Sequence, residues 1–113
     1  MGWKSTDNGE TIGTRGSENG VIDRDEEYDN GARITLERGC DHAPVAITCG
    51  IYGWMVHTRF LSTEHEGTIE YEQMKESLAA ILEQIPLVDE PGKDQKMRQV
   101  SLEIQAFVEA FPT

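Results

Sequence analysis

The sequence lacks long hydrophobic runs and a recognisable leader. Charged residues or glycine interrupt every apolar segment, so no stretch approaches the roughly 18 consecutive apolar residues of a membrane-spanning helix. Residues 1–10 contain one lysine and no apolar segment, and they therefore do not resemble a secretory signal. We expect a cytoplasmic protein that does not bind membranes.

Cysteine is scarce, since Cys40 and Cys49 are the only two in the chain. Two cysteines are too few for a disulfide framework, and we expect both thiols to be reduced. A bridge between them is the alternative if a tight hairpin brings them together. With His42 and His57 they would supply zinc-type ligands, but the spacing matches no zinc module with closely paired ligands. We therefore predict no metal and no cofactor.

Basic residues are few as well. The chain of 113 residues has 21 Asp and Glu against 10 Lys and Arg, a net charge of −11. Such a charge repels phosphate backbones, so direct nucleic-acid binding is not expected. The net charge is −5 over residues 1–30, +1 over 31–62 and −7 over 63–113, so acidic ends flank a nearly neutral centre.

Motifs with an established mechanism are absent. The glycines follow neither dinucleotide-binding nor P-loop spacing, and no G-x-S-x-G or H-E-x-x-H occurs. An EF-hand beginning at Asp23 would need Gly at its sixth position and Glu at its twelfth, where Tyr28 and Ile34 stand. The motifs therefore give no support for an enzyme or a calcium loop.

An acidic-Asn-Gly tripeptide recurs every 11 residues, as Asp7-Asn8-Gly9, Glu18-Asn19-Gly20 and Asp29-Asn30-Gly31. Asn-Gly favours the two-residue hairpin turn. The repeat therefore predicts antiparallel strands over residues 3–7, 10–18, 21–29 and 32–38. A two-residue turn at the third tripeptide would place Arg24 opposite Glu37. It would also place Asp23 opposite Arg38, so opposite charges would face each other twice.

The period of the apolar residues changes from two to about 3.6 along the chain. Residues 45–61 are typical of one bent strand or of two strands. From Thr68 onward a helical stripe is expected, formed by Tyr71, Met74, Leu78, Ile81, Leu82 and Ile85 and ended by Pro86. A second helix, capped by Asp94, carries Met97, Val100, Ile104, Phe107, Val108 and Phe111 before Pro112.

Strands followed by helices predict one α+β domain over residues 1–113, an antiparallel β-meander of about five to six strands with two C-terminal helices packed on one sheet face. Within it we expect Gly-rich, mobile edge strands over 1–31, core strands over 32–62 and the helix pair over 68–111. Residues 45–61 place large apolar side chains on both faces. The second face is therefore covered by a second subunit or partner, or else the sheet curves around its own core.

Five residues are candidates for binding. Asp23, Asp25 and Glu27 alternate along an expected strand, where their carboxylates would attract a basic protein surface. Tyr52 and Trp54 are residue types that are enriched in protein-binding hot spots.

Catalysis has weaker candidates. His57 and Arg59 point to the same side of an expected strand, and Glu37 could approach from a neighbouring strand. A histidine beside a carboxylate can act as a general acid or base near neutral pH. No nucleophile or paired-carboxylate motif accompanies them.

Composition and motifs together favour a non-catalytic protein-binding module, of the inhibitor, immunity or adaptor type, that docks on a basic partner. One alternative is a structural homodimer without small-molecule chemistry. Another is a small enzyme or metal protein that uses the His57 and Arg59 cluster.

Overall fold

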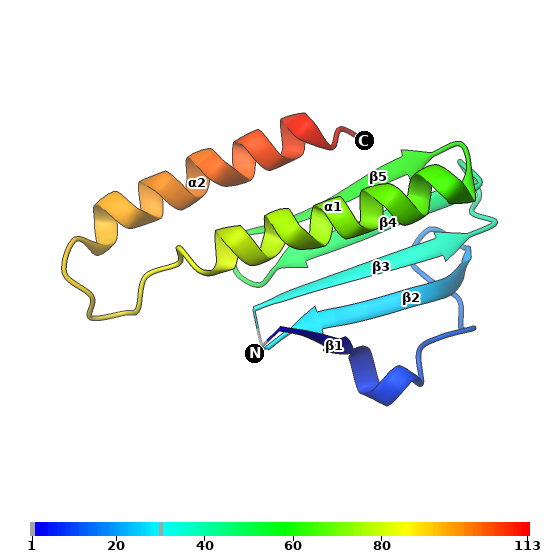
Figure 1. Cartoon of the computed structure of the whole chain (residues 1–113), viewed down its shortest axis with the longest axis horizontal. Helices are drawn as coiled ribbons and strands as arrows, with labels where there is room; N and C mark the ends of the chain where they lie inside the picture. The colour runs from blue at the N-terminus through cyan, green and yellow to red at the C-terminus, as the bar shows by residue number, and fades with distance from the viewer. Residues whose placement is uncertain (1, 30) are drawn as a thin grey trace.

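A computed structural model describes residues 2–29 and 31–113. Five strands form one antiparallel sheet in the order β1-β2-β3-β4-β5, and two helices follow them in the chain (Figure 1). The strands are β1 (Trp3–Ser5), β2 (Val21–Tyr28), β3 (Ala32–Arg38), β4 (Val45–Ile51) and β5 (Met55–Leu61). Each strand pairs with the next one in sequence, which confirms the predicted α+β meander.

The predicted strand over residues 10–18 is wrong. After β1 the chain forms a short 3-10 turn, η1 (Thr6–Gly9), and then a loop that meets β2 through an isolated bridge between Arg15 and Val21 without forming a strand. Polar residues and glycine dominate this segment, so it has few apolar side chains to bury in a sheet. The first acidic-Asn-Gly tripeptide therefore lies in a turn that joins no hairpin, and Asp7 and Asn8 have left-handed backbone angles, with φ of 47° and 55°. In the third tripeptide, Asn30 lies outside the described residues.

The register between β2 and β3 also differs from the prediction. Tyr28 pairs with Ala32, so three residues rather than two separate the paired positions. A bulge between Ile22 and Arg24 shifts the pairing once more, because the extra residue stays unpaired. The ladder cannot therefore follow a two-residue turn along its whole length.

The shifted register decides which charges meet. Arg24 pairs with Leu36 in the ladder, so the predicted pair of Arg24 and Glu37 is wrong. Asp23 and Arg38 do form an ion pair, with 3.3 Å between Asp23 Oδ1 and Arg38 Nη2, although they are not ladder partners.

The two faces of the sheet have different compositions. The face beneath the helices, the helix-covered face, carries Ala32, Ile34, Leu36, Val45, Ile47, Cys49 and Ile51 from the two central strands. Because side chains alternate along a strand, the opposite face, the open face, receives Arg33, Thr35, Glu37, Ala46, Thr48 and Gly50. The expectation of large apolar side chains on both faces is therefore wrong for β4. It holds for β5, where Val56 and Phe60 lie on the open face.

Helix α1 (Glu64–Leu82) lies over one face of the sheet, roughly along the strands, and buries Tyr71, Met74, Leu78 and Ile81 of the predicted stripe (Figure 1). The helix starts one turn earlier than expected. The hydroxyl of Thr63 accepts a hydrogen bond from the Glu66 amide at 3.1 Å and donates one to the Glu66 carboxylate at 3.1 Å. Thr63 and Glu66 have the spacing of a capping box, and the bond from the Glu66 amide to the Thr63 hydroxyl is its N-cap half.

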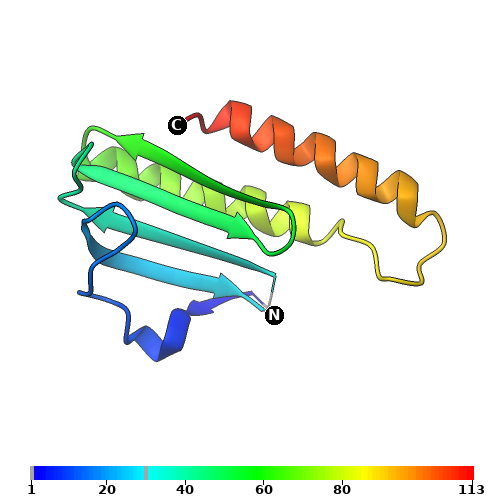
Figure 2. The ribbon, with the colours of Figure 1, turned by 180° about the vertical axis from the view of Figure 1, so that it is seen from behind.

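Helix α2 (Lys93–Ala110) lies beside α1, towards the β5 edge of the sheet (Figures 1 and 2). It begins after Gly92, so Asp94 lies in the first turn and is not the cap. Val100 and Phe107 are buried, whereas the Leu102 side chain is exposed on the far side. Neither α1 nor α2 contains an apolar stretch of the length that a bilayer requires. Both helices leave the open face uncovered.

Candidate binding site on the open sheet face

Residues 6–20 pass over the open face and are fastened there by two buried carboxylates. The Thr6 hydroxyl donates to Asp25 Oδ1 at 2.8 Å. The backbone amides of Glu18 and Gly20 donate to Glu37 Oε1 at 3.1 Å each. Asp25 is 2% exposed and Glu37 is fully buried. The N-terminal segment, rather than a second subunit, therefore covers the β2–β3 part of the open face.

The loop fits closely around Glu37. A Cβ atom at Gly16 would lie 2.2 Å from the Glu37 carboxyl carbon, so only glycine is accommodated at this position without a shift. The hydroxyl of Ser17 also donates to the carboxylate, at 3.4 Å. Glu37 thereby fixes the position of residues 15–20 on the sheet.

Asp25 is bound by a second group, the guanidinium of Arg33. Arg33 Nε donates to Asp25 Oδ1 at 2.9 Å, and Nη2 donates to Oδ2 at 2.6 Å, which is the bidentate geometry. Burial by itself would raise the pKa of Asp25, but the hydrogen bonds from Arg33 and Thr6 outweigh it and hold the pKa below its usual value. The hydrogen bond to Asp25 in turn raises the pKa of Arg33.

The predicted acidic face of β2 is consequently not formed. Asp25 is buried and neutralised by Arg33, and Asp23 is exposed but paired with Arg38. Glu27 is half-buried. Asp25 and Glu27 still share the open face, but the bulge takes Asp23 out of the alternation, and ion pairs engage Asp23 and Asp25.

A hollow of about 360 Å³ lies between the N-terminal loop and the β4–β5 hairpin. We call it the open-face hollow and define it by Arg15, Arg33, Thr35, Thr48, Tyr52 and Val56. Thr35 and Thr48 are ladder partners, and the short side chains of this face leave the space free. Its volume lies within the range of small-molecule sites.

Two side chains at the hollow are well exposed. Tyr52 is 56% exposed and Val56 is 81% exposed. Trp54, the other aromatic candidate, is half-buried and packs against the core cluster beneath the helices. The structure therefore places Tyr52 at the hollow and packs Trp54 against the core.

Arg15 supplies an unpaired positive charge at the same place. Within residues 2–29 and 31–113, ion pairs engage Arg24, Arg33, Arg38, Arg59, Lys75 and Lys96. Arg15 is exposed and forms no ion pair with a described residue. Nothing in the Gly-rich segment around Arg15 marked it as a site residue, because its position depends on the loop that Glu37 holds.

The predicted cluster of His57, Arg59 and Glu37 is not assembled. Glu37 lies on the open face, whereas His57 and Arg59 lie on the helix-covered side of β5. His57 Nε2 lies 2.6 Å from the carbonyl oxygen of Phe111. Arg59 donates to Glu70 and to the carbonyl oxygen of Pro112, at 2.7 Å each. Both side chains therefore fasten the end of the chain to β5.

Both cysteines are free thiols, and Cys49 is buried whereas Cys40 is half-buried. Burial raises the pKa of Cys49 to about 12, so the thiol is protonated at neutral pH. Burial and the charge of Glu37 also raise the pKa of Cys40. Within the described residues, no three His, Cys, Asp or Glu side chains are placed to hold a metal ion.

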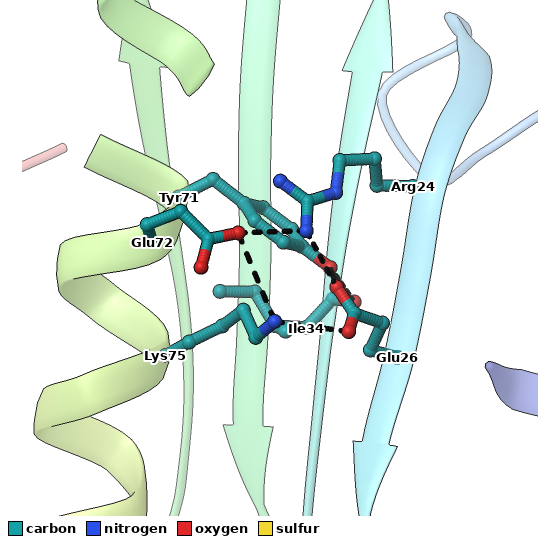
Figure 3. A network of polar contacts seen from close by, with 6 residues as sticks. All are labelled: Arg24, Glu26, Ile34, Tyr71, Glu72 and Lys75. Atoms are coloured by element: carbon teal, nitrogen blue, oxygen red, sulfur yellow. Dashed lines mark hydrogen bonds and ion pairs between the residues drawn. The ribbon is translucent and has the colours of Figure 1, made fainter. Parts of the chain in front are cut away.

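A second polar cluster lies between β2 and α1 on the helix-covered face (Figure 3). The Tyr71 hydroxyl donates to Glu26 Oε1 at 2.9 Å, and Lys75 Nζ lies 2.9 Å from Glu26 Oε2. Arg24 Nη2 lies 2.7 Å from Glu72 Oε2. Burial raises the pKa of Tyr71, so its hydroxyl remains a donor. Each charge in the cluster has an opposite partner, and the cluster joins α1 to β2.

Comparison of the chain with family models, with curated proteins and with solved structures finds no match.

Proposed function

We propose that the protein is a non-catalytic, cytoplasmic protein-binding module, of the inhibitor, immunity or adaptor type, and that the open face around the hollow is its contact surface. One observation carries this proposal: Tyr52 and Val56 are exposed beside a hollow that Arg15 and Arg33 also line. Tyrosine and arginine dominate protein-binding hot spots, which cluster around pockets. Threonine and glycine at the floor would let a partner side chain approach the sheet closely.

Contacts within the chain hold the groups of the proposed contact surface in place. Asp25 fixes the guanidinium of Arg33, and Glu37 fixes the loop that carries Arg15. Val56 stands on a regular strand. Association with an ordered surface costs less conformational entropy than association with a flexible one.

The charge of the chain favours a basic partner. Exposed carboxylates lie along α1 and at its C-cap, on the side of the sheet opposite the hollow, at Glu64, Glu66, Glu72, Glu76 and Glu83, and the net charge of the whole chain is −11. Such a field accelerates association with a positively charged protein and makes it sensitive to salt. Contacts at the hollow would then determine how slowly the complex dissociates.

Substitution at the rim of the hollow tests this proposal. The immobilised protein is used to capture partners from a lysate of the source organism, and the recovered protein is then purified and titrated against variants. We expect Tyr52→Ala and Val56→Glu each to weaken binding by at least about thirtyfold, the effect of losing a hot-spot contact.

Leu102→Glu is the matched control, because Leu102 is 60% exposed on α2, away from the hollow. It adds the same charge as Val56→Glu and should leave affinity unchanged. Equal affinities for the wild type and both rim variants would contradict the proposal, as would a loss confined to Leu102→Glu.

A symmetric dimer is a second candidate function, favoured by the exposed edge of β5. Antiparallel pairing of two β5 strands about Thr58 would place Val56 of one copy opposite Phe60 of the other, an aliphatic–aromatic pair that stabilises sheets. No acidic residue occurs within β5. Light scattering at micromolar concentration tests this, since a monomer there would exclude a stable dimer. An enzyme based on His57 and Arg59 is not proposed, because both side chains bind the chain end.

A further inference from the structure

The open-face hollow differs from its surroundings in charge. The described residues that line it include two arginines and neither an aspartate nor a glutamate, although the chain has 21 acidic residues. An anion that enters the hollow therefore meets no carboxylate on its walls.

Arg33 has donors to spare. A guanidinium carries five N–H groups. Nε and Nη2 each donate one bond to Asp25, which leaves three N–H groups without a partner among the described residues. The Arg33 side chain is 42% exposed, and Arg33 lines the hollow. Asp25 offsets its charge but keeps its plane fixed, so Arg33 offers oriented donors.

Arg15 supplies an uncompensated positive charge, because the charge of Arg33 is offset by Asp25. It lies in the loop held against the sheet, where the Gly16 amide donates to the Gly20 carbonyl at 2.9 Å and the Ile22 amide donates to the Thr14 carbonyl at 2.9 Å. The loop is thus tied on both sides of Arg15. Its guanidinium remains exposed and without an ion pair among the described residues.

The remainder of the wall is largely apolar. Val56, Tyr52 and Ile22 line the hollow together with the two arginines, as do Thr35 and Thr48. A bare inorganic anion would satisfy the arginines but leave this surface in contact with water. An apolar body joined to the anion would bury it.

We propose that the open-face hollow binds a small organic carboxylate with an apolar body. The carboxylate accepts hydrogen bonds from Arg15 and Arg33, and the apolar body lies against Tyr52 and Val56. This ligand site does not depend on the proposed protein partner, and its test requires no partner.

Titration with benzoate, followed by ¹H–¹⁵N NMR of the full chain, tests the proposal. We expect saturable shifts of the Thr48 and Tyr52 amides and of an arginine Nε–H signal, with a Kd on the order of millimolar for so small a probe. Benzamide has the same shape without the charge and should bind at least about tenfold more weakly, because charge-assisted hydrogen bonds are roughly twice as strong as neutral ones.

Two variants of equal charge locate the site. Arg15→Gln should weaken benzoate binding about tenfold. Arg98→Gln removes the same charge from an exposed position on α2 and should leave the Kd unchanged. Arg15 is exposed, so its variant should fold, and its amide spectrum verifies this. The proposal is overturned by shifts that do not saturate, by equal binding of benzamide, or by equal losses in the two variants.

Discussion

The two faces of one sheet, built from the same strands, hold the molecule together by different means. On the helix-covered face, Ile34 of β3 pairs with Cys49 of β4, and Ile47 lies next to Cys49 on the same face of β4. These three residues are at most 2% exposed. On the open face, the buried groups include Asp25 and Glu37, each of which binds the N-terminal segment. Apolar burial is non-directional, whereas hydrogen bonds require particular atoms at particular distances.

This difference assigns separate tasks to the faces. The helix-covered face closes against α1, and the apolar side chains of its two central strands are buried there. The open face uses polar anchors beneath a thin covering segment, and between this segment and the β4–β5 hairpin it leaves the hollow at Tyr52 and Val56. We infer that the first face provides most of the stability and that the second provides recognition.

The largest expected effect comes from truncating one side chain of the helix-covered face. Ile47 is fully buried beneath α1, so Ile47→Ala should destabilise the protein by about 3 kcal/mol through lost burial and a residual cavity. Its neighbour Thr48 lies on the open face at the hollow, and Thr48→Ala should cost less than about 1 kcal/mol. Urea unfolding measures both. Similar losses in the two variants would break the comparison between the faces.

A smaller effect is expected at the buried anchor of the open face. Glu37→Gln replaces an acceptor oxygen with an NH₂ group, and one backbone amide of the loop then lacks its partner. We expect a loss of about 2 kcal/mol, the cost of one unsatisfied buried group. Glu10→Gln removes the same charge at an exposed position and should be near neutral. Faster hydrogen exchange at the Glu18 and Gly20 amides would accompany the loss; unchanged exchange there would show that Glu37 does not hold the loop.

The helix-covered face was predictable from the sequence, because its signals are local and repeated. The spacing of Tyr71, Met74 and Leu78 marks a helical stripe, and the structure buries all three. The start of α1 was also readable, since Thr63 and Glu66 have the spacing of a capping box, although the apolar stripe alone placed the start at Thr68.

The open face was not predictable in the same way, because its contacts join distant residues. Asp25 meets Arg33 and Thr6 because a three-residue connection sets the register of β2 at that position. A two-residue turn predicts different partners for every residue of that strand. The open-face hollow also depends on contacts between distant residues, because Arg15 lies in a loop that Glu37 holds in place.

The smallest effect that we expect concerns pH and sharpens the role of Asp25. Its pKa is lowered in the folded protein, so the stability contributed by its ionised form is present above the ordinary carboxyl pKa of about 4. That contribution is lost as pH falls through the lowered value in the folded state. The difference in unfolding free energy between the wild type and Asp25→Asn should therefore be greatest at neutral pH and shrink in acid.

Asp23→Asn is the matched control, because the Asp23 side chain is 45% exposed, and its difference from the wild type should stay small throughout. Urea unfolding at several pH values measures both differences. If the difference in unfolding free energy between the wild type and Asp25→Asn stayed constant across this pH range, the ionised carboxylate would not anchor the open face. The two faces would then differ only in how much apolar surface they bury.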